Sequence, residues 1–427
     1  MKKFLLAGLV LLSFLSYRAE SSESSDPIQE CRLHVGLPSS SFSFQDLGVV
    51  DSLLVSGDGS LIVGNKSSKI FIITSTGKSL LDSEDSSAYG INHDGTIIVG
   101  QKRSYACAWV KMASGYSCTL LRDGSQARGV SDDGSTIVGM LFNCDSALMR
   151  PCKWQRNSDG HYEQVLSDVD NDAAGWLNGT DSKGSIAVGT LRPLGHDWVF
   201  QQACSQTPKV DSTSGEEFSV LNTENSPYGE AIAVSADGTV IAGKSQHGFR
   251  DIPVGLGAKR FPLYQACYWT GNGSEPKLLG FSGRRGFLDY FLYFQSQALA
   301  CNGDGTVIVG STSLEEYCRG FEEDLDAFVW TEQSAMLSIQ KLLTEHGVDL
   351  KGWTLTKATG ISRDGKKVVG VGVFNDGTRG WEATIPMVTP ALSYSQRVGS
   401  FLVNVVRGLL PASLSSSSTV HTVESSK

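Results

Sequence analysis

Two clusters of acidic residues are the side chains whose type and spacing best fit hydrolytic chemistry. The first is Asp168, Asp170 and Asp172, and the second is Glu322, Glu323, Asp324 and Asp326. Cleavage of a glycosidic bond needs two carboxyl groups that face each other across the sugar. Runs of charge in loops are usually solvated, and the chain contains no other catalytic motif. We therefore expect no catalytic residues.

The histidines and the acidic turns do not form a recognisable catalytic or metal site either. The seven histidines are scattered without an H-E-x-x-H pair, and the sequence contains neither G-x-S-x-G nor a Walker loop. The turn Asp132-Asp133-Gly134 looks like a fragment of a calcium loop. Such a loop needs further oxygen ligands and a distal glutamate, whereas an apolar strand begins here two residues later. We expect neither a metal ion nor a cofactor.

The Asp-Gly turns belong to a phrase that recurs seven times, in which a turn precedes apolar residues and a closing glycine. The copies are SGDGSLIVG (56–64), NHDGTIIVG (92–100), SDDGSTIVG (131–139), DSKGSIAVG (181–189), SADGTVIAG (235–243), NGDGTVIVG (302–310) and SRDGKKVVG (362–370). Their spacing of 36 to 67 residues indicates an array of one repeated sheet element. A turn role explains every copy, including the fourth, which has Lys183 in place of the aspartate.

The second copy shows how one unit is built. A strand at 88–91 ends at Asp94-Gly95, and Asp-Gly between apolar segments predicts a two-residue type I′ hairpin with positive φ at both turn positions. Strands at 96–99, 106–110 and 117–121 follow. Each copy is therefore expected to form a four-stranded antiparallel sheet.

The second strand of most copies is a continuous apolar run, as in Ile97-Ile98-Val99. Such a run buries both faces of a strand, and sheets stacked around a channel in a β-propeller do this. A glycine closes the strand in every copy, which we attribute to a special backbone angle or to close approach of the neighbouring sheet. These glycines are Gly64, Gly100, Gly139, Gly189, Gly243, Gly310 and Gly370.

Each end of the array carries one orphan strand. Residues 43–48 look like a fourth strand with no preceding three, and residues 380–386 look like a third strand with no fourth. Pairing of the two would complete a shared blade and remove the free edges. The sequence therefore predicts an all-β fold, a seven-bladed β-propeller of four-stranded antiparallel blades closed by its N- and C-terminal strands. An open β-solenoid is the alternative, which the uneven spacing disfavours.

The repeat resembles that of the extracellular HAF-repeat proteins. The match is clearest at 327–331, which read AFVWT, and at 353–365, which end in ATGISRDG, and it covers residues 42–387. The resemblance implies an exported, propeller-like domain, in some members an autotransporter passenger, without defined catalytic residues. The chain departs from the autotransporter form because only about 40 residues follow Pro386, too few for an outer-membrane barrel. Its style is similar to that of secreted proteins of chlamydia-like bacteria.

The N-terminus has the pattern of a secretory signal peptide. Lys2 and Lys3 precede an apolar stretch that is too short to span a bilayer, and small residues near Ala19 offer a cleavage site. We expect a signal peptide (1–19), an N-terminal linker (20–41), the propeller (42–387), and a tail with an amphipathic helix and a disordered serine-rich end (388–427). The expected location is the periplasm, the outer surface or the medium.

The charge balance excludes nucleic acid as a partner. The chain has 36 basic and 45 acidic residues and a formal net charge of −9. It therefore lacks the basic surface with which proteins neutralise phosphates.

The nine cysteines would suit a disulfide framework in an exported protein. However, Cys107, Cys152 and Cys267 each stand two residues before a tryptophan, where another copy has Phe328. Residues two apart in a strand share a face, so we interpret these cysteines as buried thiols. The pairs Cys107–Cys118 and Cys144–Cys152 are close enough in sequence to bridge a hairpin, and the odd count leaves a thiol for cross-linking in a structural envelope protein.

The predicted binding surface is an insertion before the sixth copy. It combines aromatic residues with two arginines, the side chains that dominate binding hot spots. The candidate binding residues are Phe281, Arg284, Arg285, Phe287, Tyr290, Phe291, Tyr293 and Phe294. Alternatively, this segment forms an over-long fourth strand and buries itself. Apolar residues at helical spacing in 392–410 offer a further contact with a membrane surface or a partner, unless that helix caps the ring.

We therefore predict an exported, non-catalytic adhesion-type module that binds a protein or a glycan, for example one of a host. The first alternative is a propeller-fold polysaccharide hydrolase or lyase with acids drawn from different blades. The second is a structural envelope protein. An enzyme should show acids that converge at the channel mouth, whereas a binding module should expose an aromatic or charged patch there.

Overall fold

The computed structural model describes residues 42–386, apart from short gaps. The gaps are 122–123, 144–147, 166–172, 194–201, 209–215, 222–227, 255–256, 272–274, 281–293, 317–320 and 376. The predicted signal peptide, linker and tail lie outside the described residues. In the part of the chain that is described, no helix is long and apolar enough to cross a membrane.

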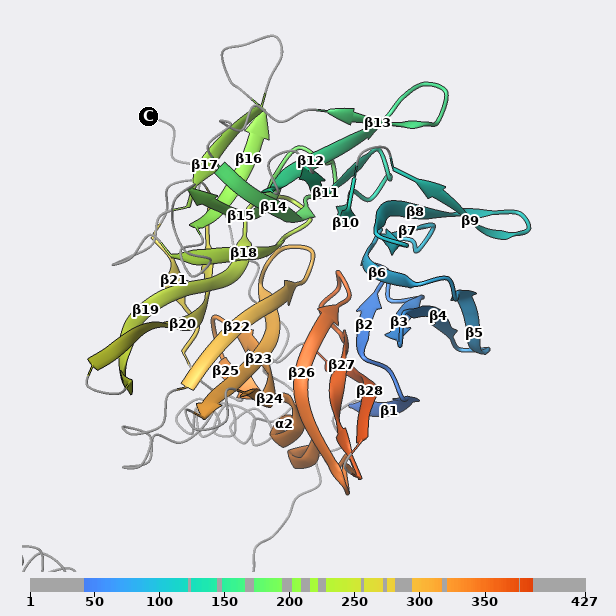
Figure 1. Cartoon of the computed structure of the whole chain (residues 1–427). Helices are drawn as coiled ribbons and strands as arrows, with labels where there is room; N and C mark the ends of the chain where they lie inside the picture. Colours follow the sequence, from blue (N-terminus) through green and yellow to red (C-terminus); the bar gives the residue numbers. More distant parts are fainter. Residues whose placement is uncertain are drawn as a thin grey trace, which may run out of the picture. The chain divides into compact units, whose positions relative to one another are not determined.

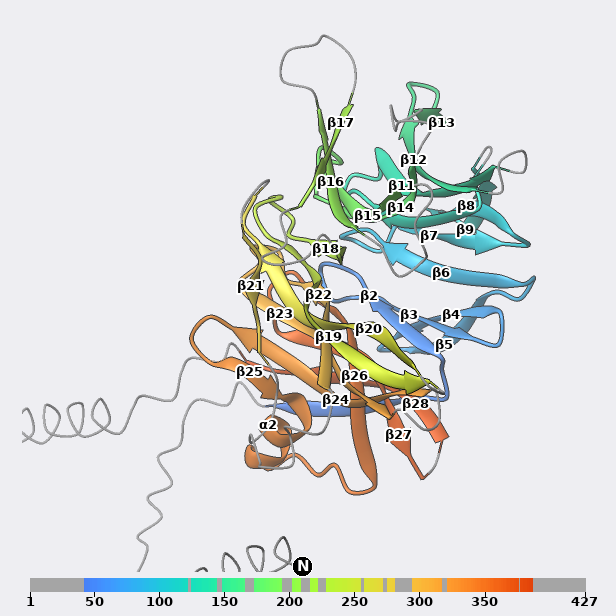
Figure 2. The same cartoon turned by 60° about the vertical axis from the view of Figure 1, so that its left-hand side comes forward.

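Seven antiparallel sheets of four strands each make up the domain (Figures 1 and 2). In chain order the first three sheets are β2 (Ser52–Val55), β3 (Ile62–Lys66), β4 (Lys69–Thr74) and β5 (Gly77–Asp82); β6 (Ser86–Ile91), β7 (Ile97–Lys102), β8 (Tyr105–Met112) and β9 (Gly115–Leu120); β10 (Gln126–Val130), β11 (Thr136–Asn143), β12 (Leu148–Arg156) and β13 (Tyr162–Val165). Each sheet is a simple meander, as the repeat predicts.

The remaining sheets follow the same plan. They are β14 (Ala173–Thr180), β15 (Ala187–Pro193), β16 (Gln202–Pro208) and β17 (Glu216–Val220); β18 (Gly229–Val234), β19 (Ile241–Val254), β20 (Gly257–Trp269) and β21 (Lys277–Leu278); β22 (Phe294–Cys301), β23 (Val307–Glu316), β24 (Phe321–Thr331) and β25 (Ala335–Ser338); β26 (Trp353–Ile361), β27 (Lys367–Phe374), β28 (Gly377–Thr384) and β1 (Ser43–Gly48). A helix, α2 (Ile339–Glu345), links the sixth sheet to the seventh.

The seventh sheet joins the two ends of the array. Strand β1 pairs antiparallel with β28, with Ser43 opposite Thr384 and Asp46 opposite Trp381. Figure 1 shows the blue β1 beside the orange β28. Arg379 Nη2 lies 2.7 Å from Asp46 Oδ2 and adds an ion pair to the junction. The prediction of a seven-bladed propeller closed by its terminal strands is confirmed.

The hydrophobic core is divided among the interfaces between adjacent sheets. Seven clusters of buried residues each join one sheet to the next, and the cluster around Leu53 and Val369 joins the first sheet to the seventh. A strand such as β7, in which Ile97, Ile98 and Val99 are all buried, faces a neighbouring sheet on each side. The continuous apolar runs therefore reflect burial of both faces of the strand, as the sequence predicts.

The repeated turns are longer than the predicted type I′ hairpins, and that prediction was wrong. Residues 92–96 separate β6 from β7, and Gly95 alone among them has a positive φ, of 71°. The Oδ1 atom of Asn92 accepts the N–H of Ile97 at 2.8 Å. The first turn residue is Ser, Asn or Asp in every copy, and its side-chain oxygen accepts the equivalent backbone N–H and so closes the turn. These residues are Ser56, Asn92, Ser131, Asp181, Ser235, Asn302 and Ser362.

The repeat glycines lie inside the second strands rather than at their ends. A β-bulge in β6 between Ala88 and Gly90 brings the carbonyl oxygen of Ser87 so close to Gly100 that a Cβ there would overlap it. The close approach therefore comes from the first strand of the same sheet and not from a neighbouring sheet. The same overlap applies to Gly100, Gly139, Gly189, Gly243, Gly310 and Gly370.

The residue opposite each repeat glycine on the third strand fills the slot predicted for a buried aromatic side chain. Cys107, Cys152 and Cys267 pair with repeat glycines and are at most 1% exposed, as is Phe328 in the sixth sheet. All four side chains lie in the core, and Cys107 and Cys267 form no disulfide. Their interpretation as buried thiols is confirmed.

Candidate binding site in the central channel

The binding residues predicted from the sequence lie outside the described residues. Phe281 to Tyr293 fall in the gap at 281–293, and Phe294 begins β22 without a described side chain. Their role stays a prediction.

The acidic clusters are only partly described. Residues 166–172 fall in a gap, and the side chains of residues 322–324 are not described. The carboxylate of Asp326 accepts the hydroxyl of Ser338 at 2.7 Å, and Ser338 caps the N-terminus of α2 by accepting the N–H of Lys341. Asp326 therefore has a structural role at the start of the helix.

The innermost strands of all seven sheets surround a central cavity of ≈ 490 Å³, which we call the channel. Each sheet contributes residues that directly precede the repeated turn, as Tyr89, Gly90 and Ile91 do from β6. The row nearest the turns is mostly aliphatic, with Val55 and Ile361 among its members. The next row is mostly glycine and alanine, because adjacent inner strands approach closely: a Cβ at Gly129 would lie 2.8 Å from the Cα of Gly179.

One end of the channel is encircled by the seven repeated turns, which we call the turn ring. Every turn is hydrogen-bonded to the next. Six of the bonds run between backbone groups: Asp58 N to His93 O, Asp132 N to Ser182 O, Ser182 N to Ala236 O, Ala236 N to Gly303 O, Gly303 N to Arg363 O, and Arg363 N to Gly57 O, at 2.8–3.0 Å. The seventh runs from Asn92 Nδ2 to Asp132 O at 3.0 Å. This circuit fixes the positions of the inner strands.

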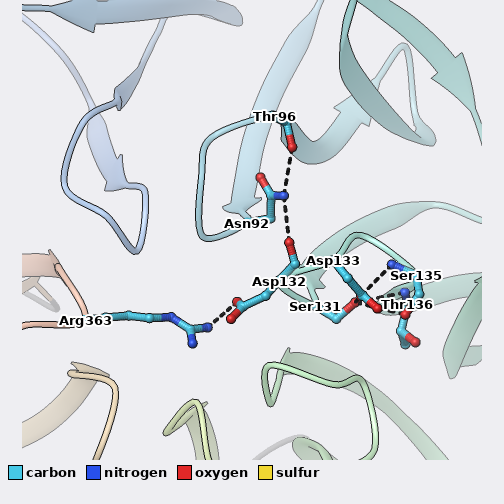
Figure 3. A network of polar contacts seen from close by, with 8 residues as sticks. All are labelled: Asn92, Thr96, Ser131, Asp132, Asp133, Ser135, Thr136 and Arg363. Atoms are coloured by element: carbon cyan, nitrogen blue, oxygen red, sulfur yellow. Dashed lines mark hydrogen bonds and ion pairs between the residues drawn. The ribbon is translucent and has the colours of Figure 1, made fainter.

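Side chains cross the turn ring at its centre (Figure 3). The guanidinium of Arg363, from the seventh sheet, forms an ion pair with the carboxylate of Asp132, from the third. A Cβ at Gly57 would overlap the side chains of both Arg363 and His93, so a larger residue there would force these side chains to move. Burial raises the pKa of Asp132, although the charges of Arg363 and His93 oppose the rise. This end of the channel is therefore occupied by the protein itself.

The opposite end of the channel carries a chain of polar side chains, which we call the polar arc. Tyr89 Oη donates to Gln101 Oε1 at 3.2 Å, and Gln126 Nε2 donates to the same oxygen at 3.4 Å. Arg128 donates to Asn178 Oδ1 at 2.8 Å. The contacts continue to the fifth sheet. The whole arc comprises Tyr89, Gln101, Gln126, Arg128, Asn178, Glu230 and Lys244.

The charged members of the polar arc are unevenly matched. Asn178 Nδ2 donates to Glu230 Oε1 at 3.2 Å, and Glu230 forms an ion pair with Lys244 at 3.2 Å. Arg128 forms no ion pair within the described part of the chain, and its hydrogen bonds go to amide oxygens. Burial lowers the pKa of Arg128, although the charge of Glu230 opposes the decrease. In the described part of the channel, Lys244 is therefore paired with a carboxylate, whereas the guanidinium of Arg128 is not.

The other side of the channel is apolar at the same depth. Ile232 and Leu299 occupy the positions in the fifth and sixth sheets that Tyr89 and Arg128 occupy in the second and third. The hydroxyl of Thr359 donates to the carbonyl oxygen of Leu53 at 2.8 Å and is therefore already bonded. The channel consequently has a polar, cationic side and an aliphatic side.

The channel residues were not among the site residues predicted from the sequence, although the sequence carries a signal for them. In six sheets a channel residue stands three residues before the repeated turn, namely Tyr89, Arg128, Asn178, Ile232, Leu299 and Thr359. In the first sheet Leu53 at this position is buried in the core, and Leu54 lines the channel instead. Residues at this place in a first strand face the channel if the sheets form a ring, so the row is readable once the seven copies are aligned on their turns.

Comparisons with known proteins bear on the fold alone. No protein-family model matches the chain, and no curated protein does. Among solved structures, the chain is similar to the β-propeller domain of the trilobed protease from Pyrococcus furiosus, with 11% identity over 82% of this chain and 99% of that one and a TM-score of 0.46. It is also similar to an oligogalacturonate lyase from Vibrio parahaemolyticus, with 10% identity over 82% and 98% of the chains and a TM-score of 0.43. The sheet order itself defines the class, a seven-bladed β-propeller.

Proposed function

We propose that this protein is an exported, non-catalytic propeller that binds a protein or glycan ligand at the channel end opposite the turn ring. The likeness of its repeats to HAF-repeat proteins and its signal-peptide pattern support export. The aromatic insertion at 281–294 would then be a second contact for the same ligand.

The composition of the channel wall is the observation that carries the proposal. Among the described residues, those that line the cavity include one cation, Arg128, several hydrogen-bonding groups and many aliphatic side chains, but no Asp, Glu, His, Cys, Ser or Lys. Glycoside cleavage needs two facing carboxyl groups, and nucleophilic catalysis needs an activated side chain. Pockets of roughly 300–1,000 Å³ with a few polar groups are typical of ligand-binding sites. The wall therefore favours binding over chemistry.

A channel-filling variant tests the proposal. Ile232→Trp places a large side chain in the channel, and Leu80→Trp, at a 54% exposed position on the outer strand β5, is its matched control. The full mature chain and both variants would be screened against arrays of defined peptides and glycans. We expect Ile232→Trp to lose the ligands that the wild type and Leu80→Trp capture. Equal capture by all three proteins would reject the channel as the site, and cleaved products after incubation would reject the non-catalytic function.

A further inference from the structure

The hydrogen bonds of Arg128 leave part of its guanidinium unused. Its Nε and Nη2 atoms donate to Gln126 Oε1 at 3.2 and 3.0 Å, and Nη1 donates to Asn178 Oδ1 at 2.8 Å. A guanidinium carries five N–H donors. Two of them therefore have no acceptor within the described part of the chain. Since Gln126 and Asn178 are neutral, they fix the orientation of the guanidinium without neutralising its charge.

The position of Arg128 makes an unmatched charge costly. The side chain is half-buried in the channel wall, and its guanidinium carbon lies 5.5 Å from the centre of the Trp176 ring, which supports it from one side. The nearby carboxylate of Glu230 is taken up by Lys244 at 3.2 Å. A buried cation that lacks a counter-charge gains most from an anion with matching geometry, and a carboxylate meets a guanidinium fork through two parallel hydrogen bonds.

The aliphatic side of the channel limits what can accompany that carboxylate. Ile232, Leu299 and Val234 face the cavity, and the row nearest the turn ring is mostly aliphatic as well. A sugar ring covered with hydroxyl groups would leave these groups without partners against this wall, at a cost for each buried group. An aliphatic side chain would instead be removed from water there.

We propose that Arg128 binds the carboxylate of a ligand whose body is aliphatic, and that this ligand is the C-terminal residue of a peptide with a side chain such as leucine. The inference rests on the proposed binding function and specifies its ligand. Arg128 binds the terminal carboxylate, Asn178 holds the guanidinium in place by accepting one of its N–H groups, and Ile232 and Leu299 contact the side chain. The turn ring, crossed by Arg363 and Asp132, sets the depth to which the peptide enters.

Calorimetric titration of the full mature chain tests this ligand. The probes are a tetrapeptide ending in leucine with a free carboxylate, the same peptide as its C-terminal amide, N-acetyl-leucine, and a galacturonate trisaccharide. Hydrogen bonds to a charged group contribute roughly 1.5–3 kcal/mol, so we expect the free acid to bind about 10- to 100-fold more tightly than the amide. Equal affinity for acid and amide, or no binding of the acid at millimolar concentration, would overturn the proposal. Tighter binding of the trisaccharide would overturn it in favour of an acidic glycan.

Three variants assign the effect to the guanidinium. Arg128→Gln should lose the preference for the acid, and Arg128→Lys should restore only part of it because an ammonium lacks the fork. Arg103→Gln, which removes a 66% exposed arginine, should bind like the wild type. Unchanged thermal unfolding would show that each variant is folded. If N-acetyl-leucine binds as tightly as the peptide, the ligand is a small carboxylic acid rather than a chain terminus.

The same variants separate this inference from the proposed function. If Ile232→Trp loses array ligands that Arg128→Gln retains, the channel is a binding site but the carboxylate assignment is wrong. If both variants retain them, the proposed function fails as well.

Discussion

The backbone N–H of Arg363 donates to the carbonyl oxygen of Gly57 at 2.8 Å and joins the last repeated turn to the first. The two residues are the second positions of their turns, so the bond repeats the contact that joins the third turn to the fourth and continues in the same way to the seventh. Together with the pairing of β1 and β28, it closes the propeller at its centre and at its outer edge. The rigid ring that results is what holds the channel residues of seven different sheets in one place.

Removal of β1 should open the propeller. We expect a mature chain lacking residues 20–41 to unfold like the full mature chain, whereas one lacking residues 20–48 should melt at a clearly lower temperature and aggregate, because β28 becomes an exposed edge. Differential scanning calorimetry with light scattering measures both effects. Identical melting of the two truncations would show that β1 does not close the ring.

The repeat glycines should differ in their tolerance of alanine. Gly100→Ala forces a Cβ against the carbonyl oxygen of Ser87, which is backbone and cannot rotate away, so we expect a loss of about 1–3 kcal/mol or more. Gly64 has no bulge beside it, and a Cβ there would meet only side-chain atoms, the nearest of which belong to Val50 and Leu53 at 3.1 and 3.3 Å. Gly64→Ala should therefore cost less. Urea denaturation would reveal whether the two variants rank in this order, and the reverse order would refute the bulge explanation.

Asp82 should make the stability of the protein depend on acidic pH. Burial alone would raise the pKa of Asp82, but hydrogen bonds from Lys102 Nζ, the N–H of Glu84 and the indole of Trp109, at 2.9–3.0 Å, lower it from 3.8 to about 2. Because the pKa is lower in the folded state, the carboxylate stabilises the fold above pH ~4, by about 2 kcal/mol, and this contribution is lost as the pH falls to ~2.

The comparison of Asp82→Asn with the wild type checks the sign of this effect. The free energy of unfolding, measured in urea between pH 2 and pH 7, should differ most at neutral pH and converge near pH 2. Asp159→Asn, in the exposed loop between β12 and β13, is the control and should follow the wild type throughout. A difference that stays constant with pH would mean that Asp82 acts through its shape and not through its charge.

The first residue of each turn should contribute to stability through its side chain. Ser131 is fully buried, and its Oγ accepts the N–H of Thr136 at 3.0 Å and donates to Asp133 at 2.7 Å. Ser131→Ala removes both bonds and should cost about 1–3 kcal/mol, since the N–H of Thr136 stays buried. Ser131→Asn should recover part of the loss, because asparagine fills this position in two other copies. Thermal unfolding that ranks alanine equal to asparagine would argue against this role.

The strands and their order were predictable because the repeat carries its own periodicity. Gly100, Ile97 and Cys107 each have a counterpart at the equivalent position of every other copy, so seven weak signals reinforce one another. The turn type was not predictable from Asp-Gly alone, because Asn92 closes the loop with a bond from its side chain. The site was missed because Arg128 and Asn178 are 50 residues apart and meet only when consecutive sheets are placed around one axis.

Hydrogen exchange of the bound protein tests most directly whether the ligand occupies the channel. The full mature chain would be compared free and saturated with a peptide selected by the arrays. We predict slower exchange in the inner strands β6, β10 and β14, around Tyr89, Arg128 and Asn178. Slower exchange confined to the outer strands or to residues 281–293, with the inner strands unchanged, would contradict binding in the channel.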